Sequence, residues 1–97
     1  MSRPKTITLD FPFSVVGVDL PARSTMDVKG DTVEDLFKEL SSQFGRKMRR
    51  YFFDEQGNWN SVLNILVNET SILYLNREKT VLKPGDVVTV LFPYSGG

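Results

Sequence analysis

Cysteine and histidine are both absent from this chain of 97 residues. Without cysteine the chain can form no disulfide, no thiolate nucleophile and no thiolate metal site. Without histidine it lacks the commonest general base and metal ligand in proteins. The remaining residues offer no nucleophile paired with a base and no phosphate-binding glycine loop. The sequence therefore argues against an enzyme that works alone, and it predicts no catalytic residue and no metal site within the chain.

Long hydrophobic runs are missing as well. None approaches the roughly 20 residues of a membrane-spanning helix, and the first residues lead into an alternating pattern rather than the apolar block of a signal peptide. The 12 basic residues balance the 12 acidic ones, so bulk charge favours neither nucleic acid nor a membrane surface as a partner. We therefore expect a single cytoplasmic domain that binds neither, and the sequon at 68–70 is expected to be a strand end and turn.

The first half of the chain predicts two strands followed by a helix. Residues 6–13 alternate with period two, which predicts a strand with one buried face. The apolar residues of that face are Ile7, Leu9, Phe11 and Phe13. Residues 22–29 predict a second, weaker strand that forms a hairpin with the first. Apolar residues then recur at helical spacing, which predicts a helix over 32–44 that is capped by Asp31 or Thr32 and ended by the glycine that follows.

Residues 46–50, Arg-Lys-Met-Arg-Arg, form the only dense run of charge. Two interpretations of this run are open. Its cations are able to dock an acidic partner, or they belong to a solvated helix end, where the helix dipole favours positive charge. The second interpretation is the more ordinary one. The aromatic residues 51–53 are expected to fold back onto the body of the domain, followed by a turn at 54–58.

The second half of the chain predicts three further strands. Residues 62–68 predict a strand with an apolar inward face and an opposite face that is only partly polar. Residues 72–75 predict a short strand. The inward residues of the first of these are Leu63, Ile65 and Val67. Pro84 and Gly85 suit the two central positions of a type II turn, and residues 87–92 predict the last strand directly after it.

Leu66 and Leu91 are predicted to point away from the helix-covered side of the sheet, because their neighbours Ile65 and Val90 point towards it. A sheet with one helix leaves one face uncovered, and aliphatic residues on that face suggest a docking patch for a partner. The alternative is that they are scattered surface residues, which are normal in soluble proteins.

The end of the chain carries the most distinctive pattern. Pro93 lacks a hydrogen-bond donor and stops the last strand. The residues after it are Tyr94, Ser95, Gly96 and Gly97. Four extended residues reach roughly 13 Å, enough to enter a deep active site. Because glycine has no Cβ, the last two residues are able to pass through a channel that excludes other side chains. Ordinary fraying of a chain end into small residues is the alternative on this pattern alone.

Several short blocks, taken in order, resemble the β-grasp or ubiquitin-like sulfur carriers. That branch includes the small subunit of molybdopterin synthase (MoaD-like) and the thiamin-pathway carrier (ThiS-like). The blocks are residues 32–36, 65–69, 82–88 and 92–97. The resemblance implies an α+β fold with a mixed sheet of four to five strands and one main helix across one face. It also implies a β-grasp domain over 1–93 and a flexible C-terminal tail over 94–97.

For function, the resemblance implies that an E1-like enzyme uses ATP to adenylate Gly97, and that sulfur transfer converts it to a thiocarboxylate. The carrier itself would bind no cofactor and would contribute no catalytic group. The large subunit of molybdopterin synthase, or another sulfur acceptor, would take the sulfur in molybdenum cofactor biosynthesis. Gly96 would provide clearance, and Pro93, Tyr94 and Ser95 would form the arm.

A partner interface is implied at Leu91, Leu66, Phe13 and Ile72, of which Leu91, Phe13 and Ile72 fall near family positions that contact the activating enzyme or the large subunit. Tyr94 departs from the second proline or small aliphatic residue that is usual in the molybdopterin synthase subunits, so the pathway is left open. The alternatives are a sulfur carrier for tRNA thiolation or another pathway, a modifier joined through its C-terminus to target lysines, and a non-covalent ubiquitin-like interaction domain.

Overall fold

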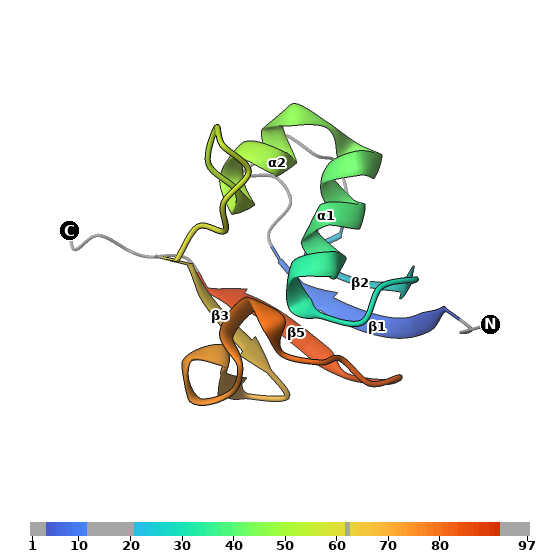
Figure 1. The fold of residues 1–97 in the computed structure, drawn as a ribbon. Helices are drawn as coiled ribbons and strands as arrows, with labels where there is room; N and C mark the ends of the chain where they lie inside the picture. Colours follow the sequence, from blue (N-terminus) through green and yellow to red (C-terminus); the bar gives the residue numbers. More distant parts are fainter. Residues whose placement is uncertain (1–3, 12–20, 62, 92–97) are drawn as a thin grey trace.

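The computed structural model describes residues 4–11, 21–61 and 63–91. These residues form one mixed sheet of five strands in the order β2-β1-β5-β3-β4, with α1 and α2 on one side of it (Figure 1). The strands are β1 (Lys5–Asp10), β2 (Arg23–Val28), β3 (Asn64–Val67), β4 (Thr70–Ser71) and β5 (Val87–Leu91). The helices are α1 (Val33–Phe44), α2 (Arg46–Phe52) and the short 3-10 helices η2 (Ile72–Tyr74) and η3 (Arg77–Lys79). The predicted α+β class and β-grasp order are confirmed, with a second helix beside the expected one.

The sheet begins with the hairpin expected near the N-terminus. β1 and β2 pair antiparallel along their whole length. β5 then pairs parallel with β1 and antiparallel with β3, so the last strand lies inside the sheet. Ile7, Leu9 and Phe11 are buried, as the alternation predicts. Phe13 lies outside the described residues.

α1 begins at Val33 because Thr32 caps it. The Thr32 hydroxyl accepts a hydrogen bond from the Asp35 amide at 3.2 Å, and the Asp35 carboxylate accepts one from the Thr32 amide at 3.2 Å. The two residues therefore form a capping box, and Thr32, not Asp31, is the cap. Gly45 follows the helix with φ at +90°, a conformation that glycine adopts without strain.

The Asp35 carboxylate makes the stability of this helix start depend on pH. A hydrogen bond from the Asp31 amide lowers the pKa of Asp35 and outweighs the opposite effect of burial. Because the folded pKa is the lower one, this stabilisation is complete above the ordinary value of about 3.9 and is lost as the pH falls through the folded value. We expect Asp35→Asn to lower the free energy of unfolding at neutral pH by about 1 kcal/mol and to flatten its decline in acid.

Urea unfolding at neutral pH and in acid measures both effects. The matched control is Glu55→Gln, which removes an exposed carboxylate in the turn after α2 and is expected to change neither the stability nor its pH dependence. Parallel pH curves for the wild type and Asp35→Asn would contradict the role given to the capping box.

A second helix, α2, forms where the sequence predicted only a run of charge and a returning aromatic segment. The side chains of Met48 and Phe52 are fully buried on its inner side. The Phe52 ring stacks on the Phe37 ring of α1, with centroids 4.0 Å apart. Two buried anchors one helical turn apart therefore fasten α2 to α1, and the expectation that the aromatic segment folds back onto the body is confirmed.

The basic run belongs to α2 and not to the end of α1. The last turn of α1 contains no basic residue, so the helix end that carries part of the run is the end of α2. Arg49 and Arg50 lie in the last turn of α2, where the helix dipole favours them. Arg46 and Lys47 lie in its first turn, where the dipole opposes them. Gly45 causes the difference, because its backbone breaks the helix just before the run.

The short strand predicted over 72–75 is wrong. β4 comes earlier, because Asn68 and Glu69 adopt positive φ angles of 50° and 74° and reverse the chain directly after β3. The chain then enters η2, where the Ser71 hydroxyl accepts a hydrogen bond from the Leu73 amide at 3.2 Å. This hydrogen bond caps a helical turn, and the residues after β4 therefore cannot extend the sheet.

The turn predicted before β5 is confirmed. Gly85 has φ at +87°, as the second central position of a type II turn requires. The Asp86 amide closes the turn by donating to the Lys83 carbonyl at 3.1 Å. Phe92, the expected last residue of the strand, lies outside the described residues, as does the predicted domain boundary after residue 93.

Candidate functional site

β5 determines where the chain leaves the sheet. It is hydrogen-bonded to β1 on one side and to β3 on the other, and its last residue is Leu91. An interior strand has no free edge, so the sheet fixes the position from which the chain continues. The residues predicted for the tail, all outside the described ranges, are Pro93, Tyr94, Ser95, Gly96 and Gly97. Their roles stay predictions.

Leu66 and Leu91 lie together on the uncovered face of the sheet. In the register of β3 and β5, Leu66 is opposite Thr89 and Leu91 is opposite Asn64, so the two leucines point to the same face on neighbouring strands. The Leu91 side chain is 40% exposed, and Leu66 is half-buried. Their orientation is as predicted, and their role in partner binding stays a prediction. We call this pair the sheet patch.

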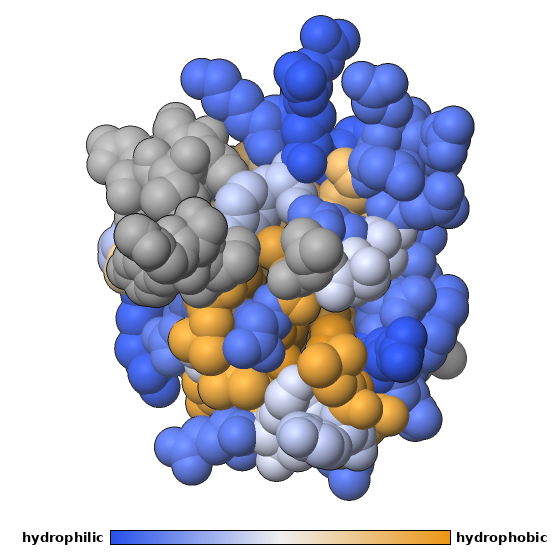
Figure 2. Space-filling view, turned by 90° about the vertical axis from the view of Figure 1, so that its left-hand side faces the viewer, coloured by the Kyte–Doolittle hydropathy of each residue, from blue (hydrophilic) through white to orange (hydrophobic). Residues whose placement is uncertain are grey.

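Ile72 is not part of an exposed surface. Its side chain is 3% exposed and belongs to the core, which corrects the expectation that it contacts a partner. Its neighbours Leu73, Tyr74 and Leu75 are exposed instead, at 61%, 86% and 42%. Figure 2 shows hydrophobic side chains gathered on the side of the molecule that carries β3 and η2. Phe13, the remaining predicted interface residue, lies outside the described residues.

Glu34 ties η3 to α1. Its carboxylate accepts a hydrogen bond from the Lys79 ammonium at 2.6 Å, and the Lys38 ammonium lies 3.8 Å away. The hydrogen bond to Glu34 raises the pKa of Lys79.

Across residues 4–11, 21–61 and 63–91, no group of three or more Asp, Glu, His or Cys residues is positioned to hold a metal ion. Within the same ranges, none of the helices has the length and apolar character needed to cross a membrane.

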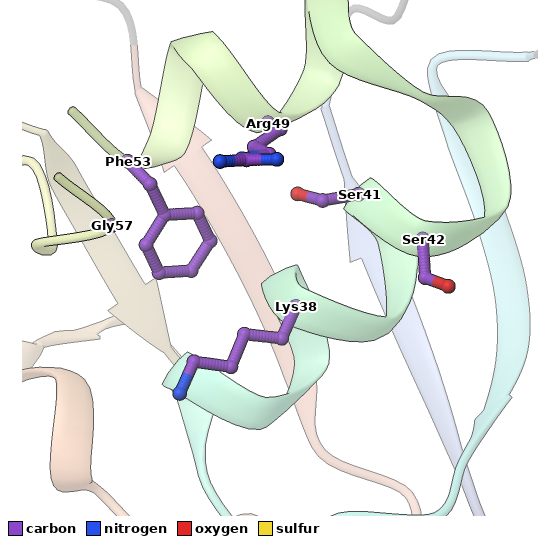
Figure 3. Close-up of a pocket in the computed structure, with 6 residues that line it drawn as sticks. All are labelled: Lys38, Ser41, Ser42, Arg49, Phe53 and Gly57. Carbon is purple, nitrogen blue, oxygen red and sulfur yellow. The ribbon is translucent and has the colours of Figure 1, made fainter. Parts of the chain in front are cut away.

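A pocket of about 320 Å³ opens between α1 and α2 (Figure 3). Its lining residues are Lys38, Ser41, Ser42, Arg49, Phe53 and Gly57. In Figure 3, Arg49 lies above the Phe53 ring and Lys38 below it, while the Ser41 side chain projects into the space between the two helices. The Ser41 hydroxyl donates a hydrogen bond to the Phe37 carbonyl at 2.7 Å. Two cations beside an aromatic ring suit a negatively charged group.

Comparison with known proteins extends these observations. A model of the ThiS family matches residues 18–97. No curated protein matches the sequence. The family match begins before β2 and ends at the last residue of the chain.

Several solved structures share the fold. Small archaeal modifier protein 1 of Methanosarcina acetivorans is 22% identical with a TM-score of 0.75, over 99% of this chain and 100% of that one. SAMP1 from Haloferax volcanii is 22% identical with a TM-score of 0.73, over 95% and 99%. The Amycolatopsis orientalis BexX/CysO complex contains a chain that is 20% identical with a TM-score of 0.70, over 94% and 99%. At these identities the likeness establishes the fold.

The family match and the fold point to the same class of protein. The match covers most of the chain, including the terminal diglycine, and the mixed sheet with its interior last strand has the β-grasp order. The chain belongs to the ThiS family of ubiquitin-like sulfur carriers.

Proposed function

We propose that this chain carries sulfur on its C-terminal glycine for molybdopterin synthesis, as the small subunit of a molybdopterin synthase. An E1-like enzyme joins the Gly97 carboxylate to AMP, and pyrophosphate leaves from ATP. Sulfur at the oxidation level of sulfide then displaces AMP, loses its proton and leaves a C-terminal thiocarboxylate. The observation that carries the proposal is a family match that extends to a diglycine end.

The chemistry explains why the chain needs no catalytic group of its own. A free carboxylate is a poor acyl donor, and adenylation supplies the leaving group that it lacks. The activating enzyme supplies ATP and the groups that act on it, and the large subunit supplies those that act on the pterin precursor. This chain contributes the C-terminal segment that follows the interior strand β5 in the sequence and a sheet patch at which these partners dock. The proposed setting is the cytoplasm.

The direct test is intact mass spectrometry of the C-terminal peptide. The purified chain is incubated with an E1-like activating enzyme, ATP and sulfide, and we expect a mass increase equal to the replacement of one oxygen by one sulfur at Gly97. A sample without ATP should show no increase. The matched variant is a chain that lacks Gly97, which ends on Gly96 and should gain sulfur far more slowly. An unmodified Gly97 in the complete reaction contradicts the proposal.

The molybdopterin assignment has a test of its own. When the thiocarboxylated chain is mixed with the large subunit and the pterin precursor, we expect the chain to return to its original mass as molybdopterin forms. If the thiocarboxylate persists in this mixture but is consumed in a tRNA thiolation assay, the chain is still a sulfur carrier. Its pathway is then tRNA thiolation and not molybdopterin synthesis.

Protein modification through Gly97 is the second candidate. It is favoured by the shared fold with small archaeal modifier protein 1 of Methanosarcina acetivorans, at a TM-score of 0.75 over 99% of this chain. In this function a lysine amine attacks the activated Gly97 carbonyl, AMP leaves, and an isopeptide bond forms. Gly-Gly remnants on lysines in digests of the native cell would identify the targets. Their absence under several growth conditions would count against this function.

A further inference from the structure

The cations of α2 occupy one continuous side of a short helix. They are Arg46, Lys47, Arg49 and Arg50, and all of them are exposed. At about 100° per residue they spread over about 160° of the helix circumference. They face away from the buried side chains of Met48 and Phe52. We call this side of α2 the basic face.

The basic face has no acidic partner in the part of the chain that the structure describes, where every ion pair involves other cations. Arg46 stands three and four residues before Arg49 and Arg50, and like charges at these spacings destabilise a helix. Arg46 and Lys47 also lie at the end of α2 where the dipole opposes cations. The run therefore lowers the stability of the free chain. Such a local loss of folding stability is expected at residues that serve a function.

The pocket between α1 and α2 continues the basic face. Arg49 belongs to both, and Lys38 of α1 brings a further cation to the opposite side of the pocket (Figure 3). Lys38 is held only weakly, because its ammonium lies 3.8 Å from Glu34, whose carboxylate already accepts a 2.6 Å hydrogen bond from Lys79. Phe53, which is 5% exposed, offers an apolar wall between the two cations.

We propose that the basic face and the adjoining pocket bind an acidic segment of a partner protein. One carboxylate of that segment binds Arg49 in the pocket, and Lys38, which lines the opposite side, adds positive charge. The planar guanidinium of Arg49 suits a carboxylate because it can donate two parallel hydrogen bonds. The methylene groups of a glutamate side chain would lie against the Phe53 ring, which makes glutamate a better occupant than a bare anion.

The acidic groups closest in sequence to the basic face do not neutralise it. The Asp54 carboxylate accepts hydrogen bonds from the Gln56 and Asn58 amides, both at 2.9 Å, and so holds the turn after α2. Glu55 lies in the same turn and is exposed. Glu34, on the far side of Lys38, is engaged by Lys79. Among the described residues, none of these carboxylates forms an ion pair with a cation of α2.

The extent of the basic face favours an acidic protein segment over nucleic acid. A helix of this length extends only about 10 Å. Duplex DNA carries a charge about every 1.7 Å along a much longer track. Because the whole chain has no net charge, the surface outside α2 has an acidic excess, and a long polyanion would be repelled by it. A short acidic segment can match the basic face without crossing that surface.

The test is a binding titration with the full chain, followed by amide NMR shifts and calorimetry. The probe is a short peptide rich in glutamate, and its glutamine counterpart serves as the neutral probe. We expect shifts confined to α2 and the pocket, binding that weakens as salt is raised, and no binding of the neutral peptide. The double variant Lys38→Gln and Arg49→Gln should weaken binding about tenfold or more.

The matched control is the double variant Lys29→Gln and Lys83→Gln, which removes the same charge from exposed positions outside α2 and the pocket. It should bind the acidic peptide as the wild type does, and thermal melts establish that each variant is folded. Equal weakening by the two double variants, or shifts spread over the whole surface, would overturn the proposal. Tighter binding of a single-stranded oligonucleotide of equal charge, or complete displacement of the peptide by inorganic phosphate, would also overturn it. The readout needs no chemistry at Gly97, so it stands apart from the sulfur-carrier test.

Discussion

Replacing Phe52 by alanine is expected to lower the free energy of unfolding by about 3–5 kcal/mol. Phe52 is fully buried, and its ring centroid lies 4.0 Å from that of Phe37, 5.4 Å from Phe11 and 6.3 Å from Trp59. These rings come from α1, from the residue directly after β1 and from the loop after α2, so alanine would leave a cavity where separate parts of the chain meet. Rigid aromatic neighbours fill such a cavity only in part. The expected loss is a large fraction of the 5–15 kcal/mol typical of a folded domain.

Urea unfolding measures this loss, provided that the slope of the unfolding curve stays unchanged. Tyr74→Ala is the matched aromatic truncation, because the Tyr74 side chain is 86% exposed, and it should change the stability by less than about 0.5 kcal/mol. Phe52→Leu keeps most of the buried volume, so its loss of stability should lie between those of Phe52→Ala and Tyr74→Ala. Similar losses for Phe52→Ala and Tyr74→Ala would contradict the place of Phe52 at the centre of the core.

The elements with one buried face were predictable from sequence. In β1, buried Ile7 and Leu9 alternate with more exposed residues. In α1, the buried residues recur at the spacing of a helix. Each of these elements lies on the surface of the domain and faces its core on one side, so the period of the pattern survives in the sequence. The same reasoning placed Leu66 and Leu91 on the uncovered face of the sheet.

The sequence failed to predict α2 and wrongly predicted a strand over residues 72–75, because neither stretch shows a clear alternation of apolar and polar residues. In α2 only Met48 and Phe52 are fully buried, so the inward stripe is hidden among cations. Residues 72–75 are all apolar, and such a run shows no period that separates a strand from a helical turn. The hydrogen bond from the Leu73 amide to the Ser71 hydroxyl favours the turn, in which Ile72 is buried and its neighbours are exposed.

The pocket between α1 and α2 could not be predicted from sequence. It joins Lys38 to Arg49 and Phe53, which are separated by the break at Gly45. Whether these side chains meet depends on how two short helices pack against each other, and that geometry follows from the aromatic core rather than from local pattern. The basic run alone indicated an acidic partner as one of two interpretations. The structure adds the position of each cation and the aromatic wall.

The proposed carrier chemistry is expected to fail when Gly96 is replaced by valine. A valine adds a branched side chain one residue before the terminal carboxylate, where the activating enzyme must enclose the chain closely to bring that carboxylate to ATP. A displacement of about 1 Å at a reacting group can cost about 100-fold in rate. We therefore expect Gly96→Val to slow adenylation of Gly97 at least about 100-fold and Gly96→Ala to have an intermediate effect.

Pyrophosphate release by the activating enzyme measures the rate, and mass spectrometry of the C-terminal peptide measures the product. The matched control is Ser95→Val, which adds a comparable side chain one position earlier, in the predicted arm, and should be adenylated nearly as fast as the wild type. All three variants should unfold like the wild type, because the substitutions lie beyond β5, whose last residue is Leu91. If Gly96→Val and Ser95→Val slow the reaction equally, the diglycine is not the feature that the enzyme selects. If wild type and Gly96→Val are adenylated at the same rate, a narrow channel around the terminus is excluded and Gly96 does not provide clearance. If the wild type itself is not adenylated, the incidental diglycine of a non-covalent interaction domain becomes the better account.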